Sequence, residues 1–337
     1  EYAQWAGVAA AASAAFLRAL RGGARADWWL YGVLIAVGLY AHLLSVLVIG
    51  AHLLYGLAFT RGEGGRLAAF AGHMGRALLV AVALFIPWLL VLIDGSHRVE
   101  QVTEWMARDI GPARVFEAWG MHLVRSFADV PAFGHTLLVG LLPLGWWLSS
   151  FALDGPRLPL LFCVLLFTAF ALVMLLPDLL LGGSRSLHPR YALPGLVAVE
   201  LAVAWALAAA WDAPGAVRRR SARAGLLVVL GAALYSGSLI LRAETWWSKN
   251  FSAQNRAVAR LMNAAERPLI LVADSGVGLG EMISLSYDLK TEAVIWGMPD
   301  PPRPVPTEGF SRVFALTPSG SLRTALGPEC DLVPVSN

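Results

Sequence analysis

Long apolar segments recur along this chain of 337 residues, and charged side chains gather between them. Most of them approach the roughly 20 apolar residues that an α-helix needs to cross the hydrocarbon core of a bilayer. Only helices and closed barrels satisfy their backbone hydrogen bonds in that environment. The sequence therefore predicts a polytopic α-helical membrane protein with about eight spans, at residues 4–20, 28–40, 43–59, 77–93, 135–153, 158–176, 192–211 and 225–241.

The composition agrees with this class of protein. Hydrophobic residues make up 57% of the chain and charged residues only 15%. The mean hydropathy of +0.62 is far above that of a soluble domain. Many of the 13 tryptophans flank the apolar segments, where an indole ring anchors a helix at the membrane surface.

Residues 28–59 are too long for one ordinary span. Tyr40, Ala41 and His42 interrupt the apolar run in its middle, and arginines flank both of its ends. Equal basic flanks place both ends on the same side of a membrane. We therefore predict a hairpin of two short helices that turns near His42.

Basic residues decide the orientation of the spans. With the spans given above, the arginine-rich loops all fall on one side of the membrane, at residues 18–25, 61–76, 157 and 218–223. The positive-inside rule makes that side cytoplasmic. The opposite, periplasmic side then holds Glu1, the turn at His42 and residues 94–133, 181–191 and 243–337.

The isoelectric point of about 9.1 follows from this bias. The arginines follow the spans and form no separate basic stripe, so we expect membrane lipids and no nucleic acid as partners. Lysine occurs only at Lys249 and Lys290, and alanine and glycine are abundant. That composition is typical of a GC-rich bacterial genome. The predicted location is the bacterial inner (plasma) membrane, with the C-terminal part periplasmic or extracellular.

Two stretches depart from the apolar pattern. Residues 94–133 mix charged and aromatic side chains at a spacing that predicts amphipathic helices on the membrane surface. Residues 243–337 have the composition of a small soluble α/β domain. There the pattern predicts helices at residues 255–266 and 281–289 and strands at residues 268–274, 293–296 and 312–316.

The loop at residues 181–191 carries the first candidate site. It presents Arg185, His188 and Arg190 at a membrane surface. A guanidinium group donates two parallel, charge-assisted hydrogen bonds to a phosphate, so the loop is suited to a lipid-linked phosphate. Contacts with phospholipid head groups at the end of a span would use the same side chains, and the pattern alone leaves both interpretations open.

Three short segments are similar to motifs of one enzyme family. Residues 1–5 (Glu-Tyr-Ala-Gln-Trp) and the span after them are similar to its Gln-Glu-x-Arg-x-Tyr segment. Residues 38–42 (Gly-Leu-Tyr-Ala-His) are similar to its Leu-Tyr-Thr-His segment, and residues 188–191 (His-Pro-Arg-Tyr) to its Arg-Tyr entry to a late span. The chain thus resembles the C-terminal two-thirds of a bacterial GT-C membrane glycosyltransferase of family 39, which includes protein mannosyltransferases and aminoarabinose transferases. Ala3 stands where the family has an arginine.

The resemblance implies transfer of a sugar from a polyprenyl-phosphate donor to a glycan, lipid or protein acceptor outside the cytoplasm. Such a reaction needs a carboxylate to deprotonate the acceptor hydroxyl and cations to stabilise the departing lipid phosphate. The family's main acid lies on a first periplasmic loop that precedes Glu1, so Glu1 would be an auxiliary acid. We accordingly expect a fragment that transfers no sugar by itself. The implied substrate-binding residues are Tyr40, His42, His97, Arg98, Arg185, His188, Arg190 and Tyr191.

No cofactor is evident from the sequence. The seven histidines form no cluster at metal-ligand spacing, and a divalent metal remains open. Residues 274–280 form a glycine-rich segment after a predicted strand, the context in which such turns cradle phosphates. Nucleotides are scarce in the periplasm and no acid follows at ribose distance, so the sequence favours a plain tight turn.

Two other functions fit a polytopic membrane protein. A transporter or lipid flippase would bury charges inside its spans and show inverted repeats, whereas these spans hold almost no acid except Glu200 and show no repeat. A non-catalytic assembly protein would bind a periplasmic partner through its C-terminal domain. It would tolerate substitution of Glu1, His42 and Arg190.

Overall fold

The computed structural model divides the chain into two compact units, Glu1–Gly237 and Ser238–Asn337, and each is described by itself. The residues that the structure describes are 2–61, 64–95, 106, 108–154, 156–211, 213, 215–243, 254–273, 276–299, 304, 308–316, 318 and 320–326. Every structural statement below concerns these residues.

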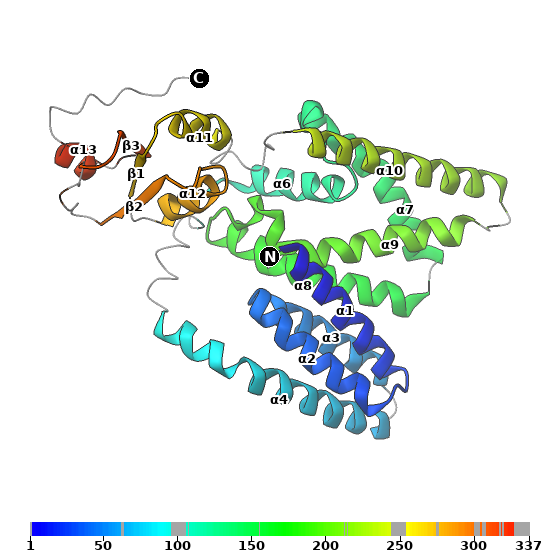
Figure 1. Cartoon of the computed structure of the whole chain (residues 1–337). Coiled ribbons are helices and arrows are strands. Elements are labelled where there is room, and N and C mark those ends of the chain that lie inside the picture. Colours follow the sequence, from blue (N-terminus) through cyan, green and yellow to red (C-terminus); the bar gives the residue numbers. More distant parts are fainter. Residues whose placement is uncertain are drawn as a thin grey trace. The chain divides into compact units, whose positions relative to one another are not determined.

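The first unit is built from helices (Figure 1). Four come first along the chain: α1 (Tyr2–Leu20), α2 (Arg25–Ala41), α3 (Ser45–Thr60) and α4 (Gly64–Asp94). They are followed by α6 (Pro112–Arg125), η2 (Pro131–Gly140), α7 (Leu141–Asp154), α8 (Arg157–Leu180), η3 (Arg185–Leu187), η4 (Pro189–Ala192), α9 (Leu193–Trp211) and α10 (Ala216–Arg242). The break between α2 and α3 lies at residues 42–44, at the turn that the sequence predicts.

Five helical segments of the described chain are long and apolar enough to cross a membrane: Gly65–Asp94, Pro131–Ser150, Arg157–Leu180, Pro189–Trp211 and Ala216–Arg242. The helix Ser45–Thr60 is apolar but shorter. Helices α1 and α2 occupy the predicted spans at residues 4–20 and 28–40 but fall outside this group. The chain is thus a helical protein with the long apolar helices of a membrane protein.

Several helices extend beyond the predicted spans. Helix α4 begins at Gly64, 13 residues before the predicted span at 77–93, and α10 begins at Ala216 in place of 225. The extension of α10 is rich in Arg and Ala, which are strong helix formers, whereas that of α4 holds three alanines and two arginines beside four glycines. The long arginine side chain can reach water from a helix near the surface. The end of an apolar run therefore does not end the helix.

Helix α4 carries an exposed apolar stripe along its length. Leu79, Val82, Ile86, Leu90 and Ile93 recur every three or four residues, and all are exposed. An apolar stripe of this length is rare on the surface of a soluble protein and marks a membrane or partner surface. Lipid acyl chains would cover it.

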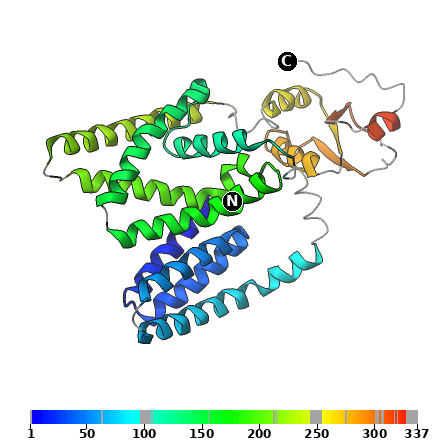
Figure 2. The ribbon, with the colours of Figure 1, turned by 180° about the vertical axis from the view of Figure 1, so that it is seen from behind.

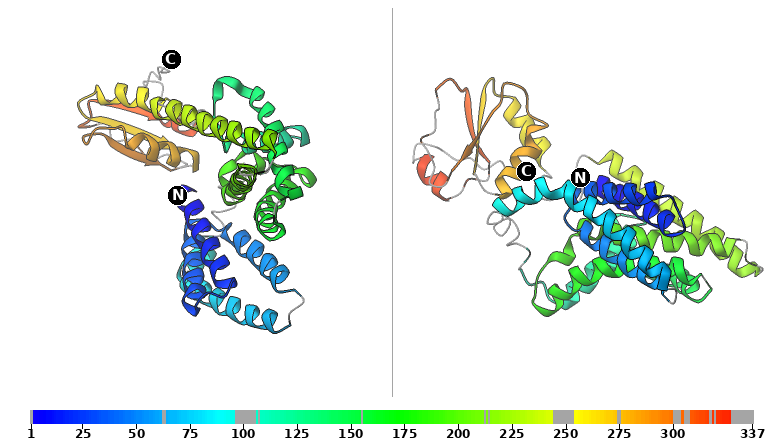
Figure 3. Two further views of the ribbon diagram at one scale, coloured as in Figure 1. Left: turned by 90° about the vertical axis from the view of Figure 1, so that its right-hand side faces the viewer. Right: turned by 90° about the horizontal axis from the view of Figure 1, so that it is seen from below.

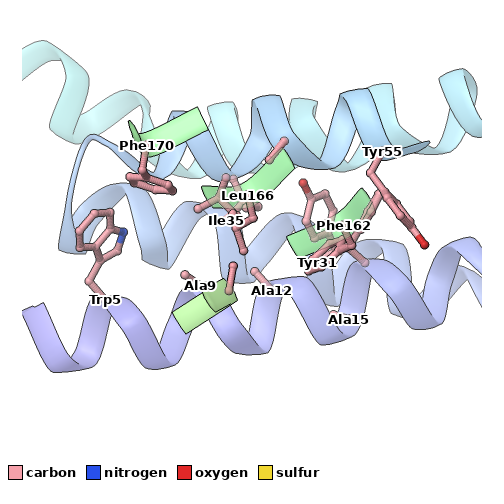
Figure 4. Close-up of a cluster of buried hydrophobic side chains, with 14 of the residues drawn as sticks. Trp5, Ala9, Ala12, Ala15, Tyr31, Ile35, Tyr55, Phe162, Leu166 and Phe170 are labelled. Atoms are coloured by element: carbon pink, nitrogen blue, oxygen red, sulfur yellow. The ribbon is translucent and has the colours of Figure 1, made fainter. Parts of the chain in front are cut away.

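Small residues bring α1 close to its neighbours. Ala9, Ala12, Ala15 and Ala19 are buried at helical spacing, and Trp5 and Phe16 of the same helix are fully buried. Figure 4 shows this alanine face turned toward large side chains from α2, α3 and α8. In membrane proteins such small residues let helix backbones approach closely and pack by van der Waals contact. The core of the first unit forms around this face.

Part of the predicted surface loop at residues 94–133 is helical. Val115, Trp119 and His122 of α6 are spaced by four and three residues and are buried, whereas Phe116 is exposed. One face of α6 is therefore covered by the rest of the unit, and α6 contacts α8, α9 and η3. Of residues 96–107, only Met106 is described.

The second unit contains a three-stranded parallel sheet. The strands β1 (Pro268–Ala273), β2 (Val294–Met298) and β3 (Arg312–Leu316) stand in the order β2-β1-β3. Leu269 to Val272 of the central strand are fully buried, alternately toward the two faces. One face packs against α11 (Asn255–Asn263) and α12 (Gly276–Ser286), and the other against α13 (Gly320–Leu326), as Figures 2 and 3 show.

The glycine-rich segment differs from its prediction. The sequence favours a plain turn over residues 274–280 and a helix from 281 to 289, but α12 runs from Gly276 to Ser286. Asp274 and Ser275 lie outside the described residues. Each glycine costs a helix only about 1 kcal/mol relative to alanine, and packing of Met282 and Leu285 against the sheet offsets this cost.

Gly32 provides a test of the close packing between α2 and α4. A methyl group at Gly32 would lie 2.5 Å from the carbonyl oxygen of Ala77 on α4, whereas a methyl group at Gly50 of α3 would meet nothing within 4 Å. We expect Gly32→Ala to destabilise the protein by about 1–3 kcal/mol, as overpacking does, and Gly50→Ala to stabilise it by up to about 1 kcal/mol, because alanine favours a helix over glycine. Thermal unfolding in detergent measures both. Equal unfolding temperatures for the two variants would contradict the packing described here.

Candidate functional site

Three separate segments of the first unit meet around His42. They are the start of α1, the turn between α2 and α3, and the short helix η4. The His42 ring stacks on Trp5 with ring centroids 4.3 Å apart and planes inclined by 20°. It also lies 5.8 Å from the ring of Tyr2 and 5.7 Å from that of Tyr191. These residues and Arg190 and His188 are called the aromatic–basic cluster below.

Trp5 holds the turn in place. Its side chain is fully buried, and its Nε1–H donates a hydrogen bond of 2.8 Å to Oγ of Ser45, the first residue of α3. Its ring also meets Phe170 of α8 edge-on at 5.8 Å. One side chain of α1 thus contacts the first residue of α3, the turn after α2 and the middle of α8, and it fixes where His42 lies.

The turn determines which nitrogen of His42 carries the proton. His42 adopts an extended backbone conformation directly after α2, and the backbone N–H of Leu44 donates to its Nδ1 at 3.2 Å. An accepting Nδ1 carries no proton, so the neutral ring has its proton on Nε2. Nε2 of His42 is therefore a hydrogen-bond donor.

Arg190 lies over the rings of two tyrosines. Its Cζ is 5.6 Å from the ring centroid of Tyr2 and 5.0 Å from that of Tyr191, and its Nη2 donates to the hydroxyl of Tyr191 at 3.2 Å. The side chain is exposed, and no described acid forms an ion pair with it. Cation–π contact orients the guanidinium while leaving donors for an anion.

His188 is the second histidine of the cluster. Its ring lies 6.1 Å from that of Tyr191, and its side chain is half-buried. Burial lowers the pKa of His188, and the positive charge of Arg190 lowers it further. The ring is therefore largely neutral at pH 7, where it can accept or donate a proton.

A buried acid that the sequence analysis did not single out supports the loop. Asp178 in the last turn of α8 is almost fully buried, and its Oδ1 accepts a hydrogen bond of 2.9 Å from Nη1 of Arg185. Its Oδ2 accepts one of 2.6 Å from the backbone N–H of Ser186. Arg185 is thus committed in part to a contact within the protein.

Glycine makes this connection possible. Gly182 and Gly183 have φ angles of +75° and +150°, in the region that other residues rarely adopt. A side chain at Gly183 would also run into Oδ1 of Asp178 and the guanidinium of Arg185. The two glycines therefore let the chain leave α8 and return to cover its buried carboxylate.

His122 of α6 contacts the same loop. Its Nε2 lies 2.7 Å from the backbone oxygen of Ser186 and donates to it, and its Nδ1 has no hydrogen-bond partner among the described residues. Burial lowers the pKa of His122 to about 4, with smaller contributions from Arg125 and His188. The neutral ring connects α6 to the loop, and a proton on Nδ1 would be buried without an acceptor.

The structure brings together four of the residues that the resemblance implies, His42, His188, Arg190 and Tyr191. Tyr40 points elsewhere: its hydroxyl donates to the backbone oxygen of Leu84 on α4 at 3.0 Å. Arg185 pairs with Asp178 of α8, and the other predicted residues, Glu1, His97 and Arg98, lie outside the described residues.

Four residues of the site were absent from the prediction: Tyr2, Trp5, Asp178 and His122. A signal for Asp178 existed in the sequence, because a lone acid follows a long apolar run seven residues before Arg185. The predicted span ended at residue 176 and left it out. Nothing in the local pattern marks His122, because its partner is a backbone atom 64 residues away.

The arginine-rich segments lie at the opposite end of the helices from the cluster. Helix α1 runs from Tyr2 in the cluster to Arg18, and α2 runs back from Arg25 to His42. Helix α8 begins at Arg157 and ends beside the loop. Cluster and arginines are thus separated along the helices, as the predicted sidedness requires, and the assignment of each side to a compartment stays a prediction.

No group of three or more potential metal ligands occurs among the residues that the structure describes. Comparison with family models, curated proteins and solved structures finds no match to the chain. Fold and cluster together define a helical protein with long membrane-length helices and an aromatic–basic cluster at one end of its first unit.

The ion pair of Asp178 and Arg185 can be tested with a double-mutant cycle. Removing one partner of a buried pair costs about 3–5 kcal/mol, because the other charge is left uncompensated. We expect the lower end of this range for Arg185→Ala and for Asp178→Ala, since Arg185 is partly exposed. The double variant should be less destabilised than the sum of the two. Additive losses of unfolding free energy would show that the two side chains do not interact.

The buried ring of His122 predicts a pH dependence of stability. Its pKa of about 4 lies below the ordinary histidine value of about 6.5. Between these values the unfolded chain binds a proton that the folded protein does not, so stability falls as the pH falls, by at most about 1.4 kcal/mol per pH unit. His122→Gln keeps a donor for Ser186 and does not titrate. Unfolding measured from pH 6.5 to 5 should show a shallower slope in this variant, and an unchanged slope would contradict the assignment.

Proposed function

We propose that the protein is an integral membrane glycosyltransferase that moves a sugar from a polyprenyl-phosphate donor to an acceptor on the periplasmic side. The supporting observation is the position of Arg190. Its exposed guanidinium lies over two tyrosine rings beside two histidines, at the end of membrane-length helices and without an acid partner among the described residues. The resemblance to GT-C glycosyltransferases supports the same function.

The chemistry requires two separate groups. The oxygen of the acceptor hydroxyl attacks the anomeric carbon, and the bond between that carbon and the phosphate oxygen breaks. A base takes the hydroxyl proton, and the lipid phosphate leaves with the bonding electrons as an anion. In this proposal Arg190 and Nε2–H of His42 would stabilise the negative charge that develops on the phosphate.

The described residues do not identify the base that takes the proton of the acceptor hydroxyl. His188 is largely neutral at pH 7, which permits a role in proton transfer, but the resemblance assigns that role to carboxylates. Glu1 precedes Tyr2 in the sequence and would be an auxiliary acid.

The alternative functions predict different properties of the cluster. In a non-catalytic assembly protein, Arg190 would contact ordinary phospholipid head groups and would not distinguish them from a polyprenyl phosphate. A lipid or glycan flippase would need charges along a path through the spans. The mid-span acid of α9, Glu200, is half-buried, and the basic cluster stands at one end of the helices.

Binding of a short donor analogue tests the proposal. Farnesyl phosphate carries the isoprenoid phosphate without the sugar, and farnesol lacks the phosphate. We expect the protein in detergent to bind farnesyl phosphate, and Arg190→Gln to raise the Kd about 10- to 100-fold, which matches the about 1.5–3 kcal/mol of a charged hydrogen bond. Arg114→Gln is a matched control, because Arg114 is exposed on α6 and forms no ion pair with another described residue.

Two results would overturn the proposal. One is equal affinity of Arg190→Gln and the control for farnesyl phosphate. The other is equal affinity of the unaltered protein for farnesyl phosphate and for phosphatidylglycerol, which favours the head-group contact of a non-catalytic protein. Sugar transfer itself is measured with the full reading frame that encodes this sequence, as release of polyprenyl phosphate from its sugar-bearing form.

A further inference from the structure

A cavity of about 340 Å³ lies at the opposite end of α1 from the aromatic–basic cluster. It is formed where α1 ends, α3 ends, and α2 and α4 begin (Figure 1). The residues that line it are Ala19, Leu20, Arg21, Gly22, Gly23, Trp28, Phe59, Thr60, Arg66, Ala69, Phe70 and His73. Its volume is at the lower end of the range for ligand pockets, about 300–1,000 Å³, and suits a head group better than a large ligand.

The lining of this cavity is basic. Arg21, Arg66 and His73 contribute to it, and none of the described residues that line it is acidic. The nearest described acid, Asp27, is already paired, because its Oδ1 accepts from Nε of Arg18 at 2.6 Å. Glu63 is close in the sequence and lies outside the described residues.

A smaller cavity of about 170 Å³ adjoins the first. Trp28 and His73 line both, and Arg25 and Arg76 line the smaller one. Trp28 and His73 therefore separate the two cavities, and basic side chains from α2 and α4 line the cavities on either side of them.

The apolar wall of the cavity is firmly packed. Trp28 and Phe70 are buried, and the ring of His73 stacks on that of Trp28 at 5.7 Å with planes inclined by only 9°. Phe70 lies so close to Gly56 of α3 that a methyl group there would overlap its ring. The ring positions are thus set by the helix packing, and the arginines extend from a preformed wall.

We propose that this cavity binds a phosphate group, that of an anionic membrane lipid or of a soluble phosphate compound, through Arg21 and Arg66. Guanidinium groups donate paired, charge-assisted hydrogen bonds that match the geometry of a phosphate. The imidazole of His73 beside them adds a further hydrogen-bonding group. The apolar lengths of α3 and α4 begin at the cavity, so the acyl chains of a lipid would lie along them. The site is separate from the cluster around His42.

The test measures retention of dioleoyl phosphatidic acid by native mass spectrometry of the protein in detergent, against dioleoyl phosphatidylcholine and against inorganic phosphate. We expect phosphatidic acid to bind more tightly than phosphatidylcholine, and Arg21→Gln/Arg66→Gln to weaken its binding at least tenfold. Arg157→Gln should bind as the unaltered protein does, because Arg157 is an exposed arginine that lines neither cavity. Thermal unfolding checks that each variant is folded.

A second variant separates the cavity from surface charge alone. Ala69 lines the cavity and is exposed, so Ala69→Trp narrows it and removes no charge. Loss of phosphatidic acid binding in both variants supports the proposal. Unchanged binding in either of them overturns it, as does equal binding of phosphatidylcholine.

The soluble ligand identifies the source of the phosphate. Inorganic phosphate that displaces the lipid at similar concentration indicates a soluble phosphate compound, and failure to displace it indicates a lipid head group. Failure of this proposal leaves the function at the other end of α1 untouched, because farnesyl phosphate binding there is tested through Arg190.

Discussion

The carboxylate of Asp178 is the constraint on which the candidate site depends. A charge buried in an apolar helix end is costly unless it is paired and hydrogen-bonded. Arg185 and the backbone N–H of Ser186 satisfy it, and they can do so only if the chain folds back over the end of α8. The chain that folds back forms η3, and its course sets the position of η4, which carries Arg190 and Tyr191. An ion pair outside the cluster thereby decides where Arg190 and Tyr191 lie.

A second fixed point comes from α1. Trp5 contacts the first residue of α3, the ring of His42 and Phe170 of α8. Its hydrogen bond to Ser45 is shielded from water, where a polar group without a partner is penalised most. The turn at His42 and the loop after α8 are therefore positioned independently, and the cluster forms where the two meet.

Much of the helical architecture could be predicted from the sequence because the bilayer imposes one rule on every span. The length and apolarity of each segment suffice to place a helix, and the break near His42 was visible as polar residues in an apolar run. Boundaries were less predictable, since arginine-rich ends such as the start of α4 continue the helix into the surface layer. The second unit followed from alternating strands and helices, apart from the start of α12 and from α13, which the pattern did not predict.

The candidate site was predictable only in part. The polar loop at residues 181–191 and His42 stood out locally, and the structure brings them together. Arg185 was interpreted as a phosphate ligand, but one of its guanidinium nitrogens donates to Asp178, seven residues earlier in the chain. Tyr40 shares a turn with His42 yet faces α4. Which way a side chain faces depends on packing between helices, and spacing along one helix does not determine it.

The length of α4 has a consequence for how the first unit sits in a bilayer. Its 31 residues, at about 1.5 Å per residue, measure roughly 46 Å, whereas the hydrocarbon core is about 30 Å thick. An excess of this size is accommodated by tilting, by bending at an internal proline such as Pro87, or by projection into the head-group layer. The polar start of α4 favours projection, and its first turns would then stand among the lipid head groups.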